Sequence, residues 1–95
     1  MPNFQEVECL VYGRVTRVMF RDFVCRRARR LGLAGTVQNL PDRSVRVIAR
    51  GEEAPLRELI SYLKRGPIFS QVEKVETVWR PPRGQTQTGF QIIYD

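Results

Sequence analysis

The sequence predicts an α+β sandwich in which two helices cover one face of a five-stranded, mostly antiparallel sheet. Several segments alternate apolar and polar residues with the period of two that is typical of strands. Two segments between them repeat apolar residues at the helical spacing of three and four. Helices that are apolar on one side must bury that side, and a sheet supplies the surface. At 95 residues the chain is expected to form one domain, residues 1–95.

The chain begins with a predicted strand and helix. Residues 6–13 place Val7, Cys9 and Val11 on one side of a strand and more polar residues on the other. From Phe20 the apolar spacing changes and predicts an amphipathic helix of about three turns. Gly32 stands where a left-handed residue commonly ends a helix.

A β-hairpin is predicted next, over residues 36–50. Residues 36–40 form a short candidate strand, and residues 45–50 alternate apolar and polar side chains. Between them, Pro41 presets the backbone angle φ at the first central position of a turn formed by residues 41–44. Gly51 is expected to break the second strand.

The second half of the chain predicts a helix and two strands. Pro55 suits the first turn of the helix, Gly66-Pro67 ends it, and four residues form its apolar stripe: Leu56, Leu59, Ile60 and Leu63. Residues 72–79 suggest a strand, although residues 73–76 also fit a helix, and residues 90–94 suggest a final strand. The order β-α-β-β-α-β, followed by a C-terminal strand, is that of the split β-α-β, or ferredoxin-like, arrangement.

Composition excludes several classes of protein. The apolar fraction of 42% and the charged fraction of 27% are typical of a globular chain and not of a disordered one. No apolar run approaches the roughly 20 residues of a membrane-spanning helix, and the N-terminus lacks the pattern of a signal peptide. We therefore expect a cytoplasmic protein without a membrane partner.

The reactive side chains are few. Histidine is absent, which removes both the commonest general base and the commonest metal ligand. Cys9 and Cys25 are expected to be reduced and to pack as small apolar residues, although a disulfide between them stays open if strand and helix face each other. We expect no metal site and no cofactor. The chemistry must then use arginine, amide, carboxylate, hydroxyl or backbone N–H groups.

The positive charge is concentrated. The net charge is +6, and the segment from Arg14 to Arg30 has seven arginines against one acid, Asp22. Such a field attracts anions, either small phosphorylated substrates or nucleic acid. Taken singly, four of these arginines are better explained as a solvated helix face: Arg26, Arg27, Arg29 and Arg30.

The loop that follows the first strand is a candidate anion site. The first N–H groups of a helix lack intrahelical partners, and the helix dipole favours an anion beside them. Arg21 would lie in this first turn, where its guanidinium can hold two phosphate oxygens. On spacing alone, an ordinary turn with a surface arginine fits equally well.

Asn39 is the second candidate. In the ferredoxin-like order the first and third strands pair in the middle of the sheet, and the second strand runs beside the third. This topology would bring Asn39 near the loop that precedes Arg21. Alternatively, the Asn39 side chain caps the adjacent turn, a common role for asparagine beside Pro-Asp.

Two motifs together resemble the acylphosphatases. They are Gly13-x-Val15-x-x-Val18-x-Phe20-Arg21 and Gly35-x-Val37-x-Asn39-Leu40-Pro41-Asp42-x-Ser44-Val45, followed by Gly51. The resemblance extends over residues 7–94. It implies a ferredoxin-like α/β sandwich that hydrolyses acyl phosphates to a carboxylate and inorganic phosphate without a metal or a covalent intermediate.

The resemblance also implies the site. Arg21 matches the arginine that binds the substrate phosphate, and Asn39 matches the asparagine that positions the attacking water. The preceding loop matches the backbone cradle for the phosphate oxygens: Arg14, Val15, Thr16, Arg17, Val18, Met19 and Phe20. The implied partners are a small acyl phosphate as substrate and inorganic phosphate as product. The protein is expected to be a monomer that does not bind nucleic acid.

This sequence departs from the family pattern at several positions. Thr16 and Arg17 replace a usual Gln-Gly, Thr36 replaces an aromatic residue, and Arg43 replaces a turn glycine. If the family's glycine at position 17 adopts a positive φ, an arginine there costs roughly 1–2 kcal/mol of stability. Alternatively, Arg17 adds a second ligand for the phosphate.

Two other functions remain as alternatives. One is a catalytically weakened member that binds phosphate, acyl phosphate or nucleic acid; the sequence has no run of aromatics typical of RNA platforms. The other is the acylphosphatase-like end of a larger maturation protein. It is disfavoured because the chain ends at Asp95 and has no cysteine-rich zinc segment.

Overall fold

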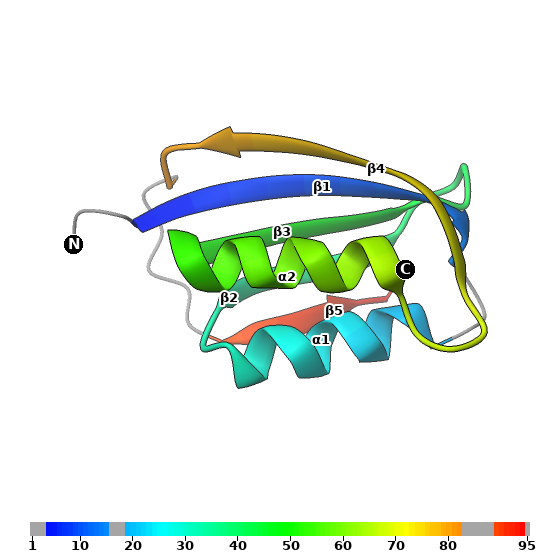
Figure 1. The fold of residues 1–95 in the computed structure, drawn as a ribbon, viewed down its shortest axis with the longest axis horizontal. Helices are drawn as coiled ribbons and strands as arrows, with labels where there is room; N and C mark the ends of the chain where they lie inside the picture. Colours follow the sequence, from blue (N-terminus) through cyan, green and yellow to red (C-terminus); the bar gives the residue numbers. More distant parts are fainter. Residues whose placement is uncertain (1–3, 16–18, 83–88, 95) are drawn as a thin grey trace.

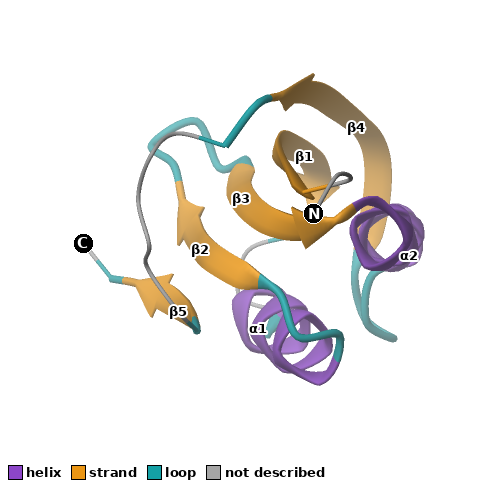
Figure 2. Cartoon of the chain, turned by 90° about the vertical axis from the view of Figure 1, so that its left-hand side faces the viewer, coloured by secondary structure: helices purple, strands orange, loops and turns teal. Residues whose placement is uncertain are grey.

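The structure, a computed structural model, describes residues 4–15, 19–82 and 89–94. These residues form a five-stranded sheet in the order β4-β1-β3-β2-β5, with two helices on one face (Figures 1 and 2). The elements are β1 (Phe4–Arg14), α1 (Phe20–Arg30), β2 (Ala34–Asn39), β3 (Val45–Glu52), α2 (Glu53–Arg65), β4 (Gln71–Arg80) and β5 (Phe90–Ile93). The predicted fold class and element order are confirmed. Within the described residues, neither helix is long and apolar enough to cross a membrane.

The sheet brings three strand ends together. Both β1 and β2 pair antiparallel with β3, so β1 and β2 run in the same direction. β5 pairs parallel with β2, at the edge of the sheet opposite β4. The carboxyl ends of β1, β2 and β5 therefore lie at one end of the sheet, where α1 begins (right-hand end in Figure 1).

The core lies between the sheet and the helices. α1 packs on β2 and β5, and α2 packs on β4, β1 and β3. Fully burying each large apolar side chain stabilises the fold by about 1.5–3 kcal/mol. The buried apolar residues of the two helices are Phe20, Val24, Cys25, Ala28, Leu56, Leu59 and Leu63. The helical stripes predicted from spacing therefore face the sheet.

One strand boundary was predicted wrongly. Gly51 does not break the hairpin's second strand, because β3 continues through it to Glu52. The Leu33 side chain packs directly over Gly51, and a Cβ there would collide with it. Glycine is needed at this position because a neighbouring side chain occupies the space above the strand.

The ambiguous segment at residues 73–76 belongs to β4. Tyr12 pairs with Lys74 while Gly13 pairs with Val72, so β4 has one extra residue at this point. Such a β-bulge moves the apolar side chains out of the period of two. This explains the helix-like spacing of three between Val72 and Val75. Gly13 permits the bulge, since its φ is +128° and a Cβ would collide with the Gln71 carbonyl oxygen.

The predicted turn residues are confirmed. Gly32 follows α1 with a left-handed φ of +74°. The N–H of Arg43 donates to the Leu40 carbonyl oxygen (3.0 Å), which puts Pro41 at the first central position of the hairpin turn. Arg43 itself has φ +72°, the conformation that glycine adopts most easily.

Candidate active site

A cavity of about 440 Å³ opens at the shared end of β1, β2 and β5. Arg21 comes from the first turn of α1 and Asn39 from the last residue of β2, and both line this cavity. Among the described residues, the lining is Val15, Met19, Phe20, Arg21, Asp22, Asn39, Ile92 and Tyr94. We call it the active-site cavity. The sheet order thus brings together the two residues that the sequence singled out.

Arg21 is held at the cavity by the end of β5. Its Nη1 donates a long hydrogen bond of 3.5 Å to the Ile93 carbonyl oxygen. Its guanidinium also lies over the Tyr94 ring, 4.9 Å from the ring centre. A cation at a helix N-terminus is unfavourable for the helix, so an anion bound between the two would offset that cost.

The start of α1 offers backbone donors. Met19 precedes the helix in a left-handed conformation (φ 60°, ψ 30°), and no side chain of the described residues caps the helix. The N–H of Phe23 is bonded to the Met19 carbonyl oxygen (3.0 Å). The three preceding N–H groups of the helix, from Phe20 to Asp22, have no intrahelical acceptor. Such a terminus is suited to bind a phosphate group.

Asn39 brings an unpartnered polar atom to the cavity. Its Oδ1 is closed to solvent and accepts no hydrogen bond from any residue that the structure describes. The turn cap considered for Asn39 is provided instead by Asp42, whose Oδ1 accepts from the Ser44 hydroxyl (2.6 Å) and the Ser44 N–H (2.9 Å). These two hydrogen bonds lower the pKa of Asp42. The Asn39 side-chain oxygen is therefore not used by the turn and stays without a hydrogen-bond partner among the described residues.

The two thiols do not contribute a nucleophile. Cys9 and Cys25 are both free and buried, so the disulfide that the sequence left open is not formed. Burial raises the pKa of each thiol. A thiol that stays protonated is a poor nucleophile. The active-site cavity thus combines a cation, N–H groups without an intrahelical acceptor and an amide, a set of groups that is suited to binding an anion and orienting a water.

The predicted phosphate cradle is only partly described. Val15, Met19 and Phe20 line the active-site cavity, whereas Arg14 is exposed at the end of β1 and does not line it. Thr16, Arg17 and Val18 lie outside the described residues.

Sequence reasoning missed three lining residues: Asp22, Ile92 and Tyr94. Asp22 could have been found as the acidic neighbour of Arg21 in the first helical turn. Ile92 and Tyr94 depend on the parallel pairing of β5 with β2, for which the local sequence has no signal.

Comparisons with known proteins agree with this geometry. The family model described as acylphosphatase matches residues 7–92. The chain is 44% identical over 91 residues to a protein of Caldivirga maquilingensis named acylphosphatase, covering 94% of each chain. It is 39% identical over 83 residues to a Thermococcus kodakarensis protein of the same name, covering 87% of this chain and 89% of the relative. The crystal structure of acylphosphatase from Bacillus subtilis superposes with a TM-score of 0.90 at 32% identity, covering 95% of this chain and 99% of that one.

Proposed function

This chain belongs to the acylphosphatase family of hydrolases, and on that premise we propose that Arg21 binds the substrate phosphate and Asn39 positions the attacking water. The observation that supports the proposal is the cavity that these two residues share. A guanidinium, the free N–H groups of a helix start and an unpartnered amide oxygen meet there.

The phosphate would bind between Arg21 and the start of α1. A guanidinium can donate two parallel hydrogen bonds to phosphate oxygens, and the N–H groups of the first turn can donate to the remaining oxygen. During phosphoryl transfer these fixed donors stabilise the charge on the equatorial oxygens. The donors are in place before the reaction, so little reorganisation is needed.

The water would be held by Asn39. Its Oδ1 accepts a hydrogen bond from the water and leaves an oxygen lone pair free to attack phosphorus. The new bond joins the water oxygen to phosphorus, and the bond from phosphorus to the acyl oxygen breaks, releasing a carboxylate. An amide is not a base, so the proton of the water passes to a phosphate oxygen of the substrate. Neither a metal ion nor a covalent enzyme intermediate enters this scheme.

The setting of the enzyme is also a proposal. We propose a cytoplasmic monomer formed by a single domain of residues 1–95. Two buried free thiols support a reducing compartment. The sheet face away from the helices has ion pairs of Glu6 and Glu8 with Arg80, where RNA-binding sheets have exposed aromatics, so nucleic acid is not a proposed partner. Size-exclusion chromatography with light scattering tests the monomer.

The direct test is release of inorganic phosphate from benzoyl phosphate with excess chelator. We expect turnover in the wild type and its loss in Arg21→Ala. Asn39→Ala is expected to lower kcat more than it raises KM, because the orientation of the water matters mainly in the transition state. The matched controls are Gln38→Ala beside Asn39 in β2 and Arg57→Ala on α2, both outside the active-site cavity. Wild-type kinetics in both Arg21→Ala and Asn39→Ala would refute the assignment.

A further inference from the structure

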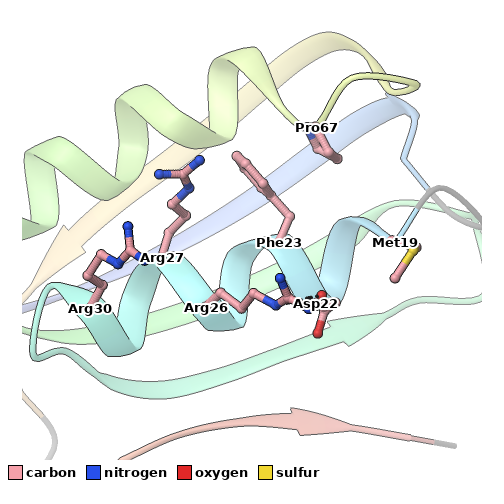
Figure 3. Close-up of a pocket in the computed structure, with 7 residues that line it drawn as sticks. All are labelled: Met19, Asp22, Phe23, Arg26, Arg27, Arg30 and Pro67. Atoms are coloured by element: carbon pink, nitrogen blue, oxygen red, sulfur yellow. Dashed lines mark ion pairs between the residues drawn. The ribbon is translucent and has the colours of Figure 1, made fainter.

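A second cavity, of about 350 Å³, lies along α1 beside the active-site cavity (Figure 3). We call it the α1 groove. Its lining is Met19, Asp22, Phe23, Arg26, Arg27, Arg30 and Pro67. Met19 and Asp22 line both cavities, so the α1 groove and the active-site cavity meet at the first turn of α1. A molecule whose phosphate occupies the active-site cavity can therefore extend along the helix.

The end of the groove nearest the active-site cavity combines three apolar side chains, Met19, Phe23 and Pro67, with the carboxylate of Asp22. Figure 3 shows the Phe23 side chain projecting from α1 towards α2, Pro67 on the segment that follows α2, and Met19 at the start of α1. Met19, which lines the groove, is 71% exposed, and Ile68 and Phe69, which follow Pro67 in the chain but do not line the groove, are 87% and 75% exposed. Large apolar side chains that are exposed together commonly mark a binding surface. They would suit the apolar part of a ligand.

The far end of the groove is cationic. Arg26 is paired with Asp22 at 3.0 Å, which compensates both charges. Arg27 lies over the rings of Phe23 and Tyr62, at 5.2 and 4.5 Å from their centres. Within the described part of the chain, neither Arg27 nor Arg30 forms an ion pair with an acid. Both are open to an anionic ligand.

The ring contacts of Arg27 argue against a merely solvated helix face. A guanidinium already held between two rings loses little side-chain freedom when it binds an anion. Along the groove, the apolar side chains and the Asp22–Arg26 ion pair lie towards the active-site cavity, and Arg27 and Arg30, which form no ion pair with any described residue, lie towards the other end. A ligand with the matching order would have an apolar chain and a terminal anion.

We propose that the α1 groove binds the acyl part of the substrate and selects acyl phosphates whose extended apolar chain ends in an anionic group, such as a carboxylate. This inference rests on the proposed function, because it requires the phosphate at the start of α1. The helix rises about 12 Å from Asp22 to Arg30. A short acyl group stays near Met19, and only an extended chain reaches the arginines.

The test compares kcat/KM for three substrates. They are acetyl phosphate, octanoyl phosphate and the mono-acyl phosphate of suberic acid, which has the chain length of octanoyl phosphate and a terminal carboxylate. The wild type is expected to prefer octanoyl to acetyl phosphate and the suberic compound to both. Arg30→Gln is expected to lower the ratio of kcat/KM for the suberic compound over octanoyl phosphate by about three- to tenfold, the range of a single exposed charged contact.

The control is Arg57→Gln on α2, which removes one positive charge away from the groove. In this variant the ratio of kcat/KM for the suberic compound over octanoyl phosphate should equal that of the wild type. The Arg30 side chain is exposed and forms no hydrogen bond or ion pair with the described residues. Arg30→Gln should therefore fold normally, and its circular dichroism spectrum should match that of the wild type.

Three outcomes would overturn the inference. Equal kcat/KM for the suberic compound and octanoyl phosphate in the wild type would refute selection of a terminal anion. An equal loss in Arg57→Gln would mean that only the net charge attracts the substrate. Both outcomes leave the proposed function intact if acetyl phosphate is hydrolysed in an Arg21-dependent way. If no acyl phosphate is hydrolysed at all, the proposed function fails and the inference fails with it.

Discussion

Glu6 and Asn39 each place a polar group in the interior, at opposite ends of the sheet. Glu6 is 1% exposed, and its carboxylate accepts hydrogen bonds from Arg80 (2.6 Å) and Arg50 (3.4 Å). Asn39 Oδ1 is equally closed to solvent but has no partner within the described residues. A buried polar atom without a partner costs about 1–3 kcal/mol. The satisfied group at Glu6 therefore serves stability, and the unsatisfied one at Asn39 indicates a site for a ligand.

The two ends differ in their arginines as well. Arg50 and Arg80 are the direct cross-strand neighbours of Glu6 in β3 and β4, so the sheet register itself holds this cluster together. At the other end, Arg21 has, among the described residues, a 3.5 Å hydrogen bond and one ring contact. Interactions at the Glu6 end are complete within the protein, whereas those at the active-site cavity leave polar groups that the proposed substrate would engage. Substitutions at the two ends should therefore affect different properties.

Arg21→Ala should lower activity strongly and leave the stability of the fold almost unchanged. Loss of the phosphate clamp is expected to lower kcat/KM for benzoyl phosphate by about 10²–10³-fold. The free energy of unfolding in urea should change by less than about 0.5 kcal/mol, because the side chain has few internal contacts. Arg21→Lys keeps the positive charge but not the paired N–H donors of the guanidinium, so it should retain only part of the wild-type kcat/KM. A large loss of stability in Arg21→Ala would show that this arginine serves the fold instead.

Glu6→Gln should have the opposite effect. Two guanidinium groups would lose their buried counter-ion, which we expect to cost about 3 kcal/mol of unfolding free energy in urea. The kcat of the folded variant should equal that of the wild type. Glu8→Gln is the matched control. Glu8 is half-buried and also forms an ion pair with Arg80 (2.8 Å), so its substitution should lower the free energy of unfolding by less than Glu6→Gln does. Equal losses in the two variants would contradict a special role for burial.

Asn39→Ala should lower kcat by about tenfold to a hundredfold, the scale of a misplaced reactant, without lowering stability. The variant removes a buried oxygen that has no partner within the described residues, so unfolding in urea should need at least as much denaturant as in the wild type. A clear drop in stability would mean that the amide is a structural group like Glu6.

The smallest expected effect concerns Asp42 and pH. Its pKa is lowered in the folded state by the Ser44 hydroxyl and N–H, so its contribution to stability is present above the unfolded-state pKa and is lost as pH falls through the folded-state pKa. The stability difference between wild type and Asp42→Asn should therefore shrink as the pH is lowered from about 7 to about 2. Thermal unfolding at several pH values measures it. A difference that does not change with pH would contradict the role of the charge.

The fold was largely predictable from local sequence. Strands and helices differ in the spacing of their apolar residues, and residues such as Gly32 and Pro41 act on their own backbone. The predictions failed or stayed ambiguous where a distant residue decides the local structure. The pairing of Gly51 with Gln5 of β1 continues β3, and the pairing of β4 with β1 includes the bulge that gives residues 73–76 a helix-like spacing.

The site divides in the same way. Its two candidate residues, Arg21 and Asn39, were identified from motifs that resemble a known family, whereas position alone also fitted a surface arginine and a turn-capping asparagine. Their common cavity, the contact of Tyr94 with Arg21 and the groove along α1 were decided by the tertiary structure alone. They depend on β5 crossing to the far edge of the sheet and on the approach of Pro67 to α1. Such contacts between residues far apart in the chain leave no periodic signal in the sequence.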